Sequence, residues 1–260
     1  MSADPTVTTT PTAPRFLTYS VPKVRWGWWD VLYGFAAFFL VLTLGITAVV
    51  LLHLGEASAD AFGFISGIVT YAALIAVIVR ASKRKGLGTL AADFGLRFRW
   101  IDLPLGLAAG LVAKLFTFLL TAIAVTVTNH TPEQGNFVLP AAPLWVVLNG
   151  VVIATLVAPF TEELFFRGLV LRAARNRRLR FGGTPVRAAV WAIAISSVLF
   201  ALLHLIQSTD ATLLIILGGS TLMLGIINSV VAIATGRIGA PIIAHVFFNG
   251  SSILLAILLT

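Results

Sequence analysis

Seven apolar stretches, each long enough to cross a bilayer as a helix, constrain this chain more than any other feature. A crossing helix needs about 20 predominantly apolar residues, because unpaired backbone polar groups are not tolerated in hydrocarbon. With 58% hydrophobic and only 11% charged residues, the chain lacks the polar surface of a soluble domain. We therefore predict an all-α, polytopic transmembrane helix bundle of about seven spans. They lie near residues 28–54, 61–79, 103–128, 143–171, 188–207, 211–235 and 238–259.

The charged residues between the spans predict how the chain is oriented. Lys23 and Arg25 precede the first span, and the densest basic groups fall in the predicted loops 80–102 and 172–187. Cytoplasmic loops are enriched in Lys and Arg, so we expect the N-terminus and both loops in the cytoplasm. The loop 129–142 would then face outward. The protein is accordingly expected in the cell membrane as a multi-pass protein.

The whole chain divides into three parts. Residues 1–22 are rich in Thr, Pro and Ala and are expected to form a disordered cytoplasmic tail. The first apolar run begins near Trp28 and is too long for a cleavable signal peptide, so it should remain as a span. We assign 23–142 to N-terminal transmembrane helices and 143–260 to a C-terminal transmembrane core. The segment 86–102 fits either an interfacial helix or an ordinary connection.

Charge and cysteine content exclude several classes of function. The net charge of +8 would suggest nucleic acid in a soluble protein, but the basic residues lie between spans. There they are typical of topology signals and lipid headgroup contacts, so we expect membrane lipids as partners and no nucleic acid. The chain has no Cys, which excludes disulfides, thiolate catalysis and Cys-based metal sites.

Glu162 and Glu163 stand side by side inside the fourth apolar stretch, where ionised groups are costly and are functional candidates by default. Arg167 lies four residues after Glu163, one turn along the same helix face, so these two can pair. Glu162 projects about 100° away and lacks so obvious a partner, which leaves it free to accept a proton or orient water. A buried charge cluster that only holds helices together fits these three residues equally well.

Two late histidines add polar groups to two further spans. His204 lies one turn after Phe200, and His245 lies one turn before Asn249. Either histidine alone is typical of an interhelical hydrogen bond. Together with the glutamates they form a set that hydrolysis can use, in which a carboxylate acts as general base and imidazoles orient water or bind a metal. The carboxamide could donate to an oxyanion.

These residues resemble a known family, the CPBP intramembrane proteases, also called the ABI family. It contains the type II CAAX prenyl endopeptidases and bacterial bacteriocin-processing or self-immunity proteins. The resemblance covers about residues 145–255; each motif alone is weak, but all three in order inside apolar spans are a specific match. The three motifs read Glu162-Glu163-x-x-x-Arg167, Phe200-x-x-x-His204 and His245-x-x-x-Asn249.

The resemblance implies a fold of membrane helices and a peptidase that cuts near the membrane. Glu162 would activate the attacking water with help from His204. His245 and Asn249 would lie around the scissile carbonyl and stabilise the oxyanion. The substrate would be a peptide or a membrane-anchored protein, in CAAX-type processing or in peptide maturation.

The resemblance also implies supporting residues and leaves the cofactor open. Glu163 and Arg167, together with Phe200, would hold the site in place. The family is described as metalloproteases, yet a metal-free glutamate mechanism is also argued for it. A catalytic Zn²⁺ with an open position takes three protein ligands, here Glu162, His204 and His245, but a glutamate that binds zinc is not a free base. Glu163 could fill one of those two roles.

Other protease signatures are missing, and one distance conflicts with the predicted spans. There is no His-Glu-x-x-His and no Gly-x-Ser-x-Gly, and the Asp residues lie at span edges. Glu162 lies about 15 Å along a helix from Arg172, whereas His204 lies about 25 Å from Arg187, towards the opposite face. Either the fifth span begins later, tilts or dips inward, or part of the predicted topology is wrong.

Two further functions use the same residues. Acids and histidines inside spans also mark ion pathways, although no internal repeat typical of transporters is visible. A non-catalytic self-immunity or scaffold protein would use them only to brace the bundle. Lys114 in the third span is expected to be structural, paired with a carboxylate or extended to an interface. Asn149 and Asn228 are expected to form interhelical hydrogen bonds.

Overall fold

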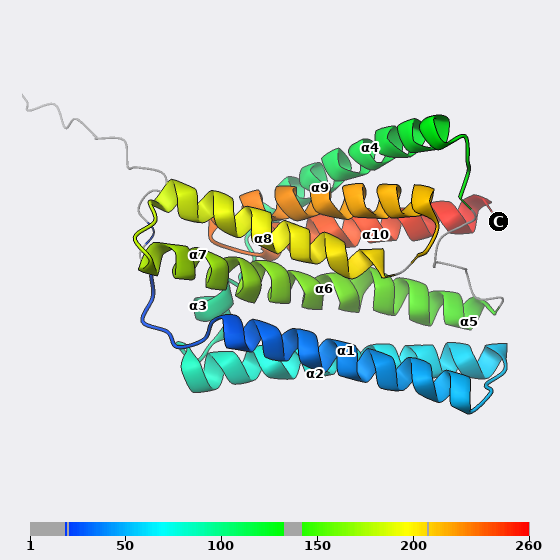
Figure 1. Ribbon diagram of the computed structural model, residues 1–260, viewed down its shortest axis with the longest axis horizontal. Coiled ribbons are helices and arrows are strands. Elements are labelled where there is room, and N and C mark those ends of the chain that lie inside the picture. The colour runs from blue at the N-terminus through cyan, green and yellow to red at the C-terminus, as the bar shows by residue number, and fades with distance from the viewer. Residues whose placement is uncertain (1–18, 20, 133–141, 207, 260) are drawn as a thin grey trace, which may run out of the picture.

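The chain folds as an all-helical bundle, shown in Figure 1 as a computed structural model that describes residues 19, 21–132, 142–206 and 208–259. Seven helices in these ranges are long and apolar enough to cross a membrane, and no strand occurs in them. The predicted fold class is confirmed, and the chain is a multi-pass membrane protein. Most of the predicted tail 1–22 and much of the predicted loop 129–142 lie outside the described residues.

The elements follow one another as helices of very different length. In chain order they are α1 (Trp28–Leu51), α2 (Glu56–Lys85), α3 (Leu90–Phe94), α4 (Asp102–Thr128), α5 (Pro143–Trp145), the π-helix η1 (Val146–Val157), α6 (Ala158–Glu163), the π-helix η2 (Leu164–Val170), α7 (Leu171–Arg180), α8 (Pro185–Leu205), α9 (Ala211–Thr235) and α10 (Gly239–Leu259).

The fourth span is one continuous helix of 38 residues, Pro143–Arg180, which runs through the middle of the bundle. It comprises α5, η1, α6, η2 and α7 in succession. In Figure 1 the hairpin of α1 and α2 lies along one side of it, while α8, α9, α10 and α4 lie along the other. Both α2 and α10 pack against η1 and α6. The short helix α6 is therefore enclosed by elements from both halves of the chain.

The predicted basic loop 172–187 is wrong over most of its length. α7 continues the fourth span to Arg180 and α8 already begins at Pro185, so only residues 181–184 connect them. Arg and Ala are favourable in helices, and Leu171 is buried in an apolar cluster with residues of α8 and α9. A dense run of arginines is thus compatible with a helix that packs on its neighbour, although it marks the end of the apolar stretch.

α3 packs into the end of the bundle where the basic residues lie. The carboxylate of Asp93 accepts hydrogen bonds from Trp26 Nε1 at 2.8 Å and from Ser82 Oγ at 2.7 Å. Phe94 is fully buried and lies against Gly168, where even a β-carbon would crowd it. Asp93 and Phe94 of the segment 86–102 are therefore buried in the bundle, whereas Phe98 and Trp100 are exposed.

The segments predicted to be cytoplasmic meet at this same end. The backbone N–H of Arg25 donates to the carbonyl of Lys85 at 2.7 Å, and Arg180 Nη2 donates to the carbonyl of Val24 at 3.0 Å. Tyr19 reaches α7, where its hydroxyl donates to Asn176 Oδ1 at 2.8 Å. Burial raises the pKa of Tyr19 above its usual value. The basic residues are thus concentrated at one end of the bundle, as the charge pattern predicts.

Candidate active site

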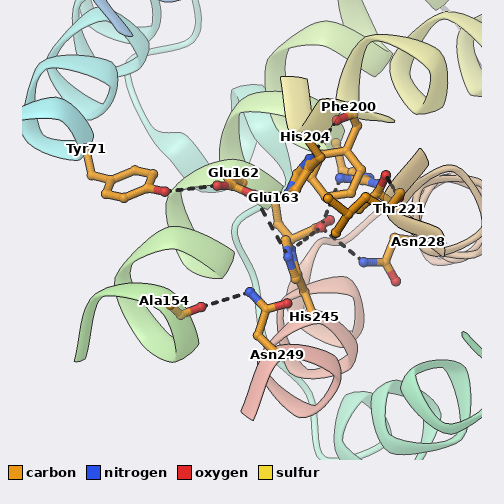
Figure 2. Close-up of polar contacts among 12 residues, drawn as sticks. Tyr71, Ala154, Glu162, Glu163, Phe200, His204, Thr221, Asn228, His245 and Asn249 are labelled. Carbon is orange, nitrogen blue, oxygen red and sulfur yellow. Dashed lines mark hydrogen bonds and ion pairs between the residues drawn. The ribbon is translucent and has the colours of Figure 1, made fainter. Parts of the chain in front are cut away.

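The glutamate and the two histidines predicted to act together do meet, inside the bundle and from three different elements (Figure 2). Glu162 lies on α6, His204 near the end of α8 and His245 in the second turn of α10. Oε2 of Glu162 is 4.0 Å from Nε2 of His204 and 3.9 Å from Nε2 of His245. The Glu162 side chain is 9% exposed and that of His204 15%, so the group is nearly but not completely enclosed.

The long fourth span explains how His204 reaches Glu162. Arg180 lies 18 positions after Glu162, and His204 lies 19 positions after Pro185. Because α7 and α8 pack side by side across a short connection, the two helices return the chain to the same level. The conflict in distance came from counting Arg172 as the end of the span, which α7 extends by two further turns. The boundary was wrong, whereas the expectation that the residues meet was not.

Both imidazoles are held through Nδ1 and present Nε2 to Glu162. Nδ1 of His204 lies 2.8 Å from the carbonyl oxygen of Phe200, one turn earlier, and must donate its proton there. Nδ1 of His245 lies 3.0 Å from Oε1 of Glu163. With the proton on Nδ1, a neutral imidazole carries its lone pair on Nε2. The two Nε2 atoms that face Glu162 are therefore placed to accept hydrogen bonds.

Glu163 is the centre of a buried polar network rather than an open group. Its Oε1 accepts from Arg167 Nη1 at 2.9 Å and from Asn228 Nδ2 at 3.0 Å, besides contacting His245. The side chains of Glu163 and Arg167 are fully buried. Asn228 also donates to the carbonyl of Pro241 at 3.2 Å, so the predicted interhelical hydrogen bond of Asn228 is confirmed. This network ties α6, η2, α9 and α10 together behind Glu162.

Phe200 packs at the junction of this network and the site. The Arg167 guanidinium lies 4.4 Å from the centre of the Phe200 ring, a cation–π distance. The rings of His204 and His245 pack edgewise on the same phenyl ring, with centroids 4.6 and 5.4 Å away. From the sequence, Phe200 was expected to neighbour His204 and to support the site. In the structure its carbonyl orients one histidine and its ring contacts both.

Sequence reasoning missed Tyr71, which lies on α2. Its hydroxyl donates to Oε1 of Glu162 at 3.1 Å (Figure 2). One carboxylate oxygen is thereby engaged by a phenol while the other, Oε2, faces the histidines. The only hint in the sequence was a tyrosine inside an apolar stretch, and nothing there connects it with a residue 91 positions later. Tyr71 is a positioning residue for Glu162.

Asn249 is held on the π-helix η1. Its Nδ2 donates to the carbonyl oxygen of Ala154 at 2.8 Å. In η1 the amide of Ala158 bonds to the carbonyl five residues back, and the next residue, Pro159, has no N–H to bond to Ala154 in the same way. Asn249 therefore satisfies a carbonyl that a proline leaves open. An amide carries two N–H groups, and this contact uses one of them.

The donor types suit Zn²⁺, but their spacing does not. Among the described residues, no group of three or more His, Asp or Glu side chains is arranged to hold a metal ion. Tetrahedral ligands about 2.0–2.1 Å from zinc lie roughly 3.4 Å from one another. Both distances from Oε2 of Glu162 to the imidazole Nε2 atoms are longer, 4.0 and 3.9 Å. Oε1 of Glu163 is engaged by Arg167, Asn228 and His245, and among the described residues its buried Oε2 has no hydrogen-bond partner.

The same spacing suits a water molecule. Glu162 Oε2 and His204 Nε2 are 4.0 Å apart. A water about 2.8 Å from each atom would form two hydrogen bonds at an angle of roughly 90°. Such a water would direct one proton to a carboxylate and the other to an imidazole lone pair. This arrangement can polarise water and take a proton from it.

Comparison with known proteins is consistent with this site. Residues 141–251 match the family model described as "Type II CAAX prenyl endopeptidase Rce1-like". The matched range contains all seven residues that the sequence motifs singled out, whereas Tyr71 lies outside it. Searches of curated proteins and of solved structures found no match.

Proposed function

We propose that this chain, whose residues 141–251 belong to the Rce1-like family of CAAX proteases, is an intramembrane endopeptidase that uses a glutamate-activated water. The observation that carries the proposal is the placement of Glu162 Oε2 opposite the Nε2 atoms of two oriented histidines. A brace alone would not need three side chains to leave their acceptor atoms facing a common space. The basic end of the bundle is proposed to face the cytoplasm of the cell.

The chemistry follows from which atoms are free. Glu162 takes a proton from water on Oε2 while His204 Nε2 accepts the hydrogen bond of the second proton, and the water oxygen attacks the scissile carbonyl carbon. The carbonyl oxygen becomes negative, and the second N–H of Asn249, with His245 when it carries a proton on Nε2, is the proposed donor to it. The C–N bond then breaks as Glu162 returns the proton to the leaving amine.

The proposed substrate is the C-terminal part of a membrane-associated peptide or protein, as in CAAX-type processing. The site lies inside a membrane bundle, so the substrate must enter from the bilayer or its surface. The name of the matching family supports a prenylated chain. Peptide maturation uses the same chemistry on a different substrate.

The test compares peptide termini in membranes of cells that lack the protein and are complemented with matched amounts of wild type, Glu162→Gln or Asp60→Asn. Gln keeps the shape of Glu162 but cannot accept a proton, and Asp60→Asn controls for loss of a carboxylate elsewhere. We expect new termini with wild type and Asp60→Asn only. Identical termini with Glu162→Gln would overturn the peptidase and favour the self-immunity or scaffold reading.

A second measurement addresses the metal. The purified full-length protein is assayed on a peptide cleaved in the first test, with and without 1,10-phenanthroline, and its metal content is measured by mass spectrometry. The glutamate mechanism predicts that turnover survives the chelator. Loss of turnover that is restored by adding Zn²⁺ would show that a metal belongs to the site despite the spacing.

A further inference from the structure

Lys114 is a buried cation that the proposed chemistry does not use. It lies near the middle of α4, twelve residues from Asp102, or roughly 18 Å along the helix. Lys114 is 8% exposed. Nζ donates to Ser252 Oγ and lies 4.2 Å from the centre of the Phe248 ring, both on α10. The sequence predicts a structural role through pairing with a carboxylate or extension to an interface, and in the described residues Nζ contacts a hydroxyl and an aromatic ring instead of a carboxylate.

Within the part of the chain that the structure describes, no carboxylate is paired with this ammonium. Among the described residues, no carboxylate lies within 4.0 Å of Lys114, whereas Lys85 and Arg167 each pair with one. A hydroxyl and an aromatic face offset only part of the cost of burying a charge in a membrane helix. Ser252, whose hydroxyl accepts the hydrogen bond from the ammonium, is itself exposed. An anion that reached Nζ would offset the remaining cost.

We propose that Lys114 binds the C-terminal carboxylate of the peptide substrate. The inference rests on the proposed function, because it places one end of the substrate relative to Glu162. His245 and Ser252 are seven residues apart on α10, which is two turns along the same face and roughly 10 Å. An extended peptide rises about 3.4 Å per residue, so roughly three residues span this distance. Lys114 would therefore set where the chain is cut by holding its end.

The depth of Lys114 favours a carboxylate over a lipid phosphate. The hydrocarbon core of a bilayer is about 30 Å thick, and headgroups lie outside it. Lys114 sits close to the midpoint of α4, whose 27 residues are about 40 Å long. A headgroup phosphate would have to be drawn far below its layer. A peptide that already enters the bundle to reach Glu162 brings its own carboxylate to this level.

The test uses the full-length protein in detergent and a fluorescent peptide that ends in S-farnesyl-cysteine and three aliphatic residues. The peptide is made as the free acid and as the C-terminal amide. Binding is measured on the Glu162→Gln background, where no turnover can occur, and cleavage is measured on wild type. Each is repeated with Lys114→Met, which keeps most of the length of the side chain without its charge. Lys83→Met, at the basic end, is the control.

We expect the free acid to bind and to be cleaved at least about tenfold better than the amide, and Lys114→Met to reduce this ratio to about one. The amide should bind Lys114→Met as well as it binds the parent, and Lys83→Met should keep the ratio. Equal use of acid and amide by the parent protein overturns the proposal without any variant, as does an unchanged ratio in Lys114→Met. If the free acid binds better than the amide only when Lys114 is present, but wild type does not cleave the peptide, the carboxylate site is supported and the proposed peptidase function is overturned.

Discussion

The hairpin of α1 and α2 buries little of itself, whereas the elements around the glutamates are buried almost throughout. α1 has three buried residues, Asp30, Val31 and Gly34, and many of its large apolar side chains are exposed. All seven residues of η2 are buried, and so are five of the six in α6. Most of the hairpin surface is thus specified by apolar character, while the C-terminal core depends on particular polar pairs.

The difference teaches where sequence specificity is needed. On a helix face that contacts lipid, many apolar residues are interchangeable, so the sequence of that face contains no fixed motif. A buried ion pair or hydrogen bond requires two residues at fixed places. The family match covers 141–251, the region of such pairs. Yet the hairpin is not merely lipid-facing, because it delivers Tyr71 to Glu162 and Ser82 to Asp93.

The largest effect on stability is expected from breaking the central ion pair. Arg167→Met leaves Glu163 buried without its cation and should cost about 3–5 kcal/mol, measured as loss of accumulated protein and of thermal stability in detergent. The matched change in the hairpin is Lys85→Met, which breaks the 2.7 Å pair with Asp30. Because Lys85 is partly exposed, its loss should be much smaller. Equal losses would contradict the contrast between the two regions.

The next effect concerns the contribution of the hairpin to the site. Tyr71→Phe removes the hydrogen bond to Glu162 Oε1 but keeps the ring, and should lower kcat about tenfold because a hydrogen bond to a charged group is lost. KM and the unfolding temperature should stay near wild type. Tyr33→Phe on α1, whose side chain is exposed, serves as the control. A fall in stability that matches the fall in kcat would make Tyr71 only a packing residue.

A smaller effect is expected where Asn249 compensates for Pro159. Asn249→Ala leaves the Ala154 carbonyl without its partner and should cost about 1–3 kcal/mol of stability. Pro159→Ala restores an N–H that can bond to that carbonyl within the π-helix, so the cost of Asn249→Ala should shrink in its presence. The measurement is a double-mutant cycle on the unfolding temperature. Additive effects would show that the two residues do not share this carbonyl.

The smallest effect is expected at the start of α9, at the end of the bundle opposite the basic one. Asp210 caps α9, and the backbone N–H of Leu213, with help from His130 at 2.8 Å, lowers its pKa. A lowered folded-state pKa stabilises the protein above the unfolded value of about 3.9, and the contribution is lost as pH falls through the folded value. Wild type should therefore lose stability below about pH 4 slightly faster than Asp210→Asn. Parallel unfolding temperatures from pH 7 to 3 would exclude this contribution.

The spans and the motif residues could be predicted because each depends on a local property. Apolar runs of bilayer length are visible without any contact, and seven were predicted. Their boundaries agree within a few residues except for α7 and for α2, which is five residues longer at its start and six at its end than the predicted 61–79. Spacing of four residues identifies neighbours on a helix, so the pairing of Glu163 with Arg167 was predictable and is present at 2.9 Å. The basic run 172–180 was misjudged because charge marks the end of an apolar stretch, not the end of a helix.

By itself, the sequence determined that this is a seven-span helical membrane protein and which polar residues in three spans form the motifs. Only the tertiary structure decided which atoms of those residues are free. It assigned Glu163 to a buried network and left Oε2 of Glu162 facing two imidazoles. It also brought Tyr71 to Glu162 and placed Lys114 against Ser252 and the Phe248 ring. Hydrogen bonds between helices depend on how the helices pack, and no spacing along one chain encodes that packing.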